Sequence, residues 1–69
     1  MTTFFDANQA RLKLKMILSN YCWYKGSCII MDKDENNFVI LINVSDMSDN
    51  IFKIIPKLFD GFKTKIGLE

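Results

Sequence analysis

The middle of the chain holds two runs of strand-forming residues on either side of a polar segment. Residues 28–31 and 38–44 are rich in isoleucine, valine and other apolar residues, whereas residues 32–37 are all charged or amide side chains. This pattern is typical of an antiparallel hairpin with a polar turn. Because 69 residues have room for only one small domain, we expect a single domain over residues 1–69 built around this hairpin.

A helix is predicted before the hairpin. Asp6 and Gln9 have the spacing of a capping box, so we expect a helix from about Asp6 to Asn20. Its apolar residues recur at helical spacing and form one core-facing stripe. The members of this stripe are Ala7, Ala10, Leu14, Ile17, Leu18 and Tyr21. Leu12 and Met16 lie nearly opposite the stripe, so we expect them to be exposed and to contact a partner.

The two strands of the hairpin differ in composition. The first is expected over residues 21–31, with a bulge at Gly26. In the second, even-numbered residues from Phe38 to Val44 should face the helices and odd-numbered ones the other side. Both sides are apolar, which favours a central strand or a sheet with one face covered by something else. Val39 and Leu41 are therefore a second candidate partner surface.

A second helix and a last strand are predicted after the hairpin. Cap residues at 45–49 precede apolar residues at helical spacing, and Pro56 should end the helix near Ile54 or Ile55. We expect a turn over residues 57–60. From Phe62 onward apolar residues alternate with polar ones, which predicts a strand with one basic face carrying Lys63 and Lys65.

The expected fold is α+β with element order α-β-β-α-β and both helices on one face of a three-stranded sheet. An alternative order is α-β-β-α, with the end of the chain frayed or helical. The predicted core consists of Leu14, Ile17, Leu18, Ile40, Ile42, Phe52 and Ile55.

The end of the chain carries a short motif. Ile55-Pro56, four residues, Gly61 and an alternating strand follow one another. This arrangement resembles the closing segment of small uncharacterised α/β proteins from bacteria and phages. The resemblance implies a similar fold and no particular activity.

Composition removes several classes of function. Nine basic and eight acidic residues give no strong field for a polyanion, and without histidine the two cysteines cannot complete a four-ligand zinc site. We expect no metal or cofactor. Cys22 and Cys28 are expected to be buried free thiols in a reducing cytosol, because a strand of this length separates them by about 20 Å and a disulfide would require a sharp bend at Gly26. No segment has the apolar length of a membrane span or the pattern of a signal peptide, so we expect a cytoplasmic protein without membrane contact.

The candidate catalytic groups are weak. Asp32, Asp34 and Glu35 fall in the polar turn, where we expect a solvated loop, and a cysteine nucleophile would lack a histidine base. The three glycines are isolated and match no phosphate-binding motif. We therefore expect no enzymatic activity.

Two hypotheses of function remain. The first is a non-enzymatic protein-interaction module that binds a second copy of itself, or alternatively another protein, through Leu12 and Met16 or through the sheet face around Val39 and Leu41. The second is a small single-stranded nucleic-acid-binding protein, in which aromatic side chains stack on bases and lysines contact phosphates. Its residues would be Tyr21, Trp23, Lys25, Lys63 and Lys65.

Overall fold

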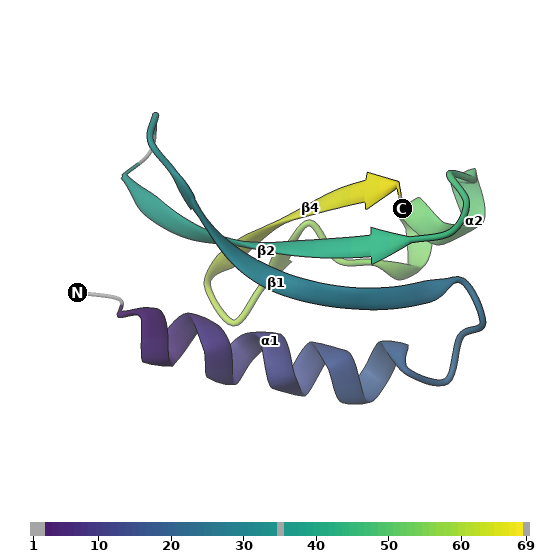
Figure 1. Ribbon diagram of the computed structural model, residues 1–69, viewed down its shortest axis with the longest axis horizontal. Helices are drawn as coiled ribbons and strands as arrows, with labels where there is room; N and C mark the ends of the chain where they lie inside the picture. Colours follow the sequence, from purple (N-terminus) through teal and green to yellow (C-terminus); the bar gives the residue numbers. More distant parts are fainter. Residues whose placement is uncertain (1–2, 35, 69) are drawn as a thin grey trace.

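A computed structural model of the chain describes residues 3–34 and 36–68. It contains two helices and a four-stranded mixed sheet with strand order β1-β2-β4-β3 (Figure 1). The elements are α1 (Phe4–Leu18), β1 (Tyr24–Asp32), β2 (Asn37–Val44), α2 (Asp49–Ile54), β3 (Leu58–Phe59) and β4 (Phe62–Leu68). The predicted α+β class is confirmed, whereas the three-stranded sheet and the order α-β-β-α-β are wrong by one short strand.

Helix α1 begins earlier than its sequence pattern suggested. The Thr3 hydroxyl accepts a hydrogen bond from the Asp6 backbone N–H at 3.2 Å, and the Asp6 carboxylate accepts one from the Thr3 N–H at 3.3 Å. This is a capping box with Asp6 at its third helical position, not at its cap. The predicted cap at Asp6 is therefore wrong, and the helix is shifted toward the N-terminus by about half a turn.

The central hairpin is confirmed. Strands β1 and β2 are antiparallel, with Ile29 opposite Ile40, and the register shifts beside Gly26 as expected for a bulge. Gly26 has a φ of 141°, a backbone conformation that residues other than glycine rarely adopt. Strand β2 lies between β1 and β4 and is therefore a central strand, in agreement with the apolar residues on both of its faces.

The chain returns to the sheet through α2 and a second hairpin. Helix α2 ends at Ile54, before Pro56, as predicted. Strand β4 then runs parallel to β2. Residues 57–60, predicted as a simple turn, instead contain β3, which pairs antiparallel with β4. Asp60 and Gly61 join these strands with φ values of 51° and 85°, the positive values of a two-residue hairpin loop.

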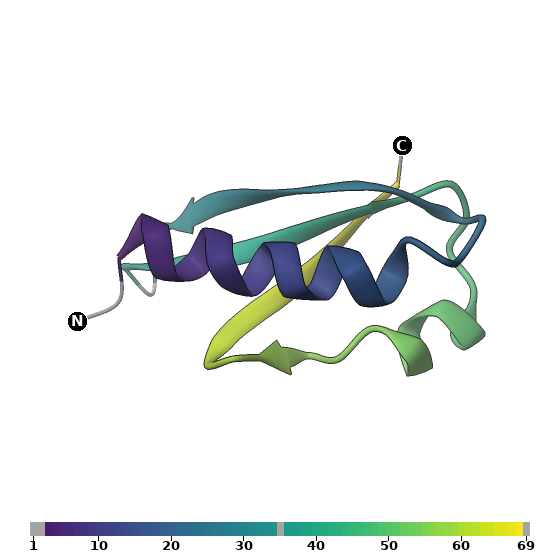
Figure 2. The same cartoon turned by 90° about the horizontal axis from the view of Figure 1, so that it is seen from below.

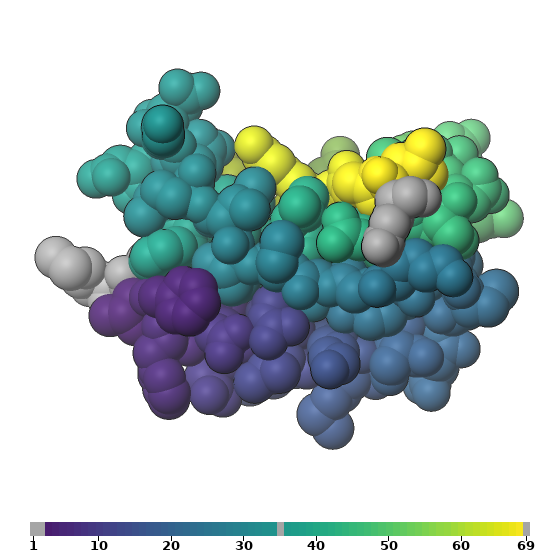
Figure 3. Space-filling view, in the orientation of Figure 1, coloured from purple at the N-terminus to yellow at the C-terminus, as the bar shows by residue number. Residues whose placement is uncertain are grey.

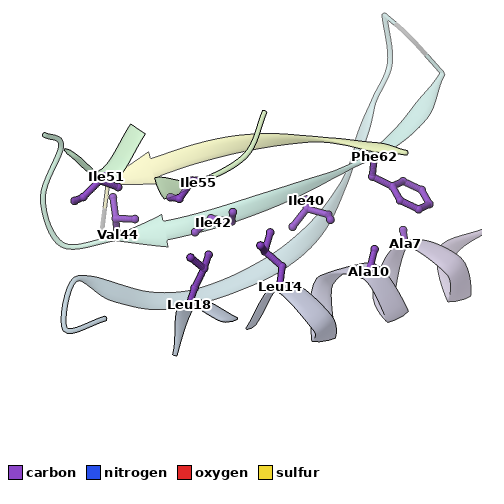
Figure 4. Close-up of a cluster of buried hydrophobic side chains, with 10 residues drawn as sticks. All are labelled: Ala7, Ala10, Leu14, Leu18, Ile40, Ile42, Val44, Ile51, Ile55 and Phe62. Atoms are coloured by element: carbon purple, nitrogen blue, oxygen red, sulfur yellow. The ribbon is translucent and has the colours of Figure 1, made fainter. Parts of the chain in front are cut away.

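The hydrophobic core lies between α1 and one face of the sheet (Figure 4). Leu14 and Leu18 point from α1 toward the even-numbered residues of β2, and Phe62 lies over the small side chains of Ala7 and Ala10. Small residues on the helix therefore make room for a large one on the sheet. The buried cluster comprises Ala7, Ala10, Leu14, Leu18, Ile40, Ile42, Val44, Ile51, Ile55 and Phe62.

Two predicted core residues lie outside this cluster. Ile17 is 54% exposed and Phe52 is 46% exposed. Helix α2 lies beside the end of the sheet and away from α1, so neither helix covers the flank of the other (Figures 1 and 2). The six-residue helix inserts Ile51 into the core, and Ile55 follows it at the helix end. The prediction was wrong at Ile17 and Phe52 because it assumed that the two helices pack side by side.

Candidate functional site

The outer face of α1 carries an apolar stripe that contributes nothing to the core. Phe5, Leu12 and Met16 are separated by seven and four residues, so they lie within about 40° of one another around the helix. Their exposed fractions are 67%, 38% and 77%. The structure thus places Leu12 and Met16 where the sequence predicted them. We call Phe5, Leu12 and Met16 the outer stripe.

Sequence reasoning missed Phe5 as a member of the outer stripe. Because the predicted helix starts at Asp6, Phe5 precedes it and is not assigned to either side of the helix. The overlooked signal was the spacing of Thr3 and Asp6, which also fits a capping box and would have brought Phe5 into the first turn.

The sheet face turned away from α1, here called the open face, is formed by the odd-numbered residues of β2 and their neighbours. Val39 lies between Ile30 and Lys63, and Leu41 lies between Cys28 and Lys65. In Figure 3 the open face is seen from the side, and the upper outline of the molecule dips between the hairpin tip and α2. The predicted basic face of β4 is therefore present on the open face.

Val39 offers almost no surface, although no helix covers the open face. It is only 1% exposed. An ion pair of 3.8 Å joins Lys65 of β4 to Asp32 of β1. Val39 lies in the row of cross-strand neighbours between the row that contains Lys65 and the row that contains Asp32, so the ion pair crosses over it. The twisted sheet therefore folds its own side chains over Val39. Val39 is therefore too buried to contact a partner, and Leu41 is half-buried.

The five residues predicted to bind nucleic acid are divided between different parts of the molecule. The rings of Tyr21 and Trp23 stack with their centroids 4.9 Å apart, and Trp23 packs against the core on the helix side of the sheet. Lys63 and Lys65 lie on the opposite face. Lys25 is exposed at the β1 bulge. The structure therefore does not form a single surface from these five residues.

The two cysteines differ from their prediction in one respect. Both are free thiols, but both are exposed, so the expectation of buried thiols was wrong. Cys22 lies in the turn after α1, which is not part of a strand. Cys28 lies at the middle of β1, on the open face beside Leu41.

The described residues contain no pocket and no cluster of three potential metal ligands. Asp32 and Asp34 lie at the hairpin turn, where the Asp34 backbone N–H donates to the Asp32 carboxylate at 3.0 Å. Glu35 lies outside the described residues. Within residues 3–34 and 36–68, neither helix has the length and hydropathy needed to cross a membrane.

Comparison of the chain with protein-family models, with curated proteins and with solved structures gave no significant match. The surfaces described above are consequently the basis of the functional argument.

Proposed function

We propose that this protein is a non-enzymatic interaction module that self-associates through the outer face of α1. The observation that carries this proposal is the outer stripe, three large apolar side chains that are aligned on one helix face and lie outside the buried core cluster. An aligned apolar stripe on a surface helix is the usual basis for packing against another helix.

The partner we propose is the α1 helix of a second copy, in antiparallel orientation. In the N-terminal half of α1 the charged residue is Asp6, whereas the C-terminal half carries Arg11, Lys13 and Lys15. Antiparallel pairing brings the basic half of each helix beside the acidic half of the other and opposes the helix dipoles. Parallel pairing would set the basic halves against each other.

Antiparallel pairing also matches the side chains of the outer stripe. A two-fold axis midway between Phe5 and Met16 brings Phe5 of each copy against Met16 of the other, with Leu12 near the axis. Contacts between a methionine sulfur and an aromatic ring contribute about 0.3–1.5 kcal/mol each. Because the stripe is about 16 Å long, the contact is small and association through it should be weak.

The test is the mass of the protein in solution. Replacing both residues in the double variant Leu12→Glu/Met16→Glu should reduce the assembled mass in sedimentation velocity and leave the circular dichroism spectrum unchanged. Ser45→Glu/Asn50→Glu adds the same charge at two exposed positions outside α1 and should keep the wild-type mass. An unchanged mass in the α1 variant would contradict the proposed contact.

We further propose that the module acts in the cytoplasm. Two exposed free cysteines suit a reducing compartment.

A further inference from the structure

The two edges of the sheet differ in how well they are protected. Strand β3 forms one edge and has two residues, whereas β1 forms the other and has nine. In the part of the chain that the structure describes, β1 pairs only with β2. In Figure 2 β1 runs along the upper side of the molecule, and the end of β4 reaches the same level. One side of its backbone therefore presents N–H and C=O groups to solvent.

The sequence of this edge is unusual for an exposed strand. Natural edge strands are commonly blocked by charged residues, proline, bulges or short length. In β1 the bulge lies at one end, beside Gly26, and Asp32 closes the other end. Between them Ser27–Met31 contains no charge and no proline, and Cys28 and Met31 in this segment are exposed.

From this edge we infer a second self-association site: β1 pairs antiparallel with β1 of another copy and joins the two sheets. The charges at the ends of the strand favour this orientation. Lys25 is exposed at one end, and the hairpin turn with Asp34 follows the other end, where Asp32 is ion-paired with Lys65 of its own chain. Antiparallel pairing therefore places each Lys25 beside the hairpin turn of the other copy and keeps the two Lys25 side chains apart. Parallel pairing would place like charges together. Near the two-fold axis the middle segments of the two strands would face each other, and neither segment carries a charge that would repel the other.

This contact is independent of the outer stripe. The stripe faces away from the sheet, whereas β1 lies at the side of the sheet, so one chain can use both surfaces. Two different two-fold contacts on one chain produce a closed tetramer or an open assembly, and either contact alone produces a dimer. Loss of one contact and loss of the other are therefore separable by experiment.

Cys28 provides the direct test, because it lies at the centre of β1 and thus close to the proposed axis. The variant Leu12→Glu/Met16→Glu/Cys22→Ser retains Cys28 as its one cysteine and removes the α1 contact. A short bis-maleimide should convert it to a covalent dimer. The matched variant Leu12→Glu/Met16→Glu/Cys28→Ser retains Cys22, in the turn after α1, and should remain largely uncross-linked.

A second measurement tests the contact without a reagent. Cys28→Lys places two lysines at the axis and should reduce the assembled mass to that of the dimer formed through α1, whereas Cys22→Lys adds the same charge away from the edge and should not. Both variants should retain the wild-type circular dichroism spectrum. Equal cross-linking of the Cys22 and Cys28 variants, or an unchanged mass in Cys28→Lys, would overturn the inference and leave the α1 proposal intact.

Discussion

The two faces of α1 are both apolar, yet they have different environments. Leu14, on the inner face, is 2% exposed and packs in the core, whereas Leu12, two residues earlier, is 38% exposed and belongs to the outer stripe. The same residue type on the same helix therefore stabilises the fold at one position and is available to a partner at the other. Apolarity alone does not distinguish these roles.

The two leucines should differ strongly in their contribution to stability. Leu14→Ala should lower the free energy of unfolding by about 2–5 kcal/mol, because it leaves a cavity against the sheet. Leu12→Ala should change it by less than about 0.5 kcal/mol in the monomer. Urea unfolding, followed by circular dichroism at a protein concentration low enough to prevent association, measures both. Equal losses for the two variants would mean that the faces of α1 have been assigned wrongly.

A smaller effect tests where α1 begins, and hence whether Phe5 belongs to the outer stripe. Thr3→Ala removes the side-chain acceptor of the capping box and should cost about 0.5–2 kcal/mol of unfolding free energy. Thr3→Ser keeps a hydroxyl and should retain most of the stability. If Thr3→Ala has no effect on thermal or urea unfolding, the helix begins later and Phe5 leaves the stripe.

The smallest expected effect concerns the flank of α1 between its two faces. Lys13 forms an ion pair of 3.2 Å with Asp60 in the loop between β3 and β4, and the two side chains are 64% and 43% exposed. Lys13→Ala should therefore cost only about 0.2–1 kcal/mol at low salt, and less as salt screens the pair. Lys15→Ala removes the same charge from the opposite flank and should show less salt dependence in unfolding. The reverse ranking would exclude a contribution from the Lys13–Asp60 pair.

Much of the fold was readable from local patterns. Alternation of apolar residues predicted β2 and β4, and the polar residues between 32 and 37 predicted the hairpin. Pro56 predicted the end of α2, because proline cannot continue a helix without losing a backbone hydrogen bond. The candidate contact residues Leu12 and Met16 were also correctly placed on the outside of α1.

One missed element had a local signal. Asp60-Gly61 is a strong signal for a two-residue hairpin loop, yet the flanking Leu58-Phe59 is too short to show alternation. Tertiary hydrogen bonds hold the segment in place. The Thr64 side chain donates to the carbonyl of Pro56, and the Thr64 backbone N–H donates to the carbonyl of Lys57 at 3.1 Å.

The amino-acid pattern alone predicts the elements that have a clear period, because periodicity reflects which side chains share one face of a helix or strand. Which of those faces is covered was decided by the tertiary structure. Ile17 has the spacing of a core residue but is exposed, because α2 packs at the end of the sheet and not beside α1. Val39 has the spacing of a surface residue but is buried, because the Lys65–Asp32 pair spans its row on a twisted sheet. Burial depends on contacts between distant segments, and a local pattern contains no information about where those segments meet.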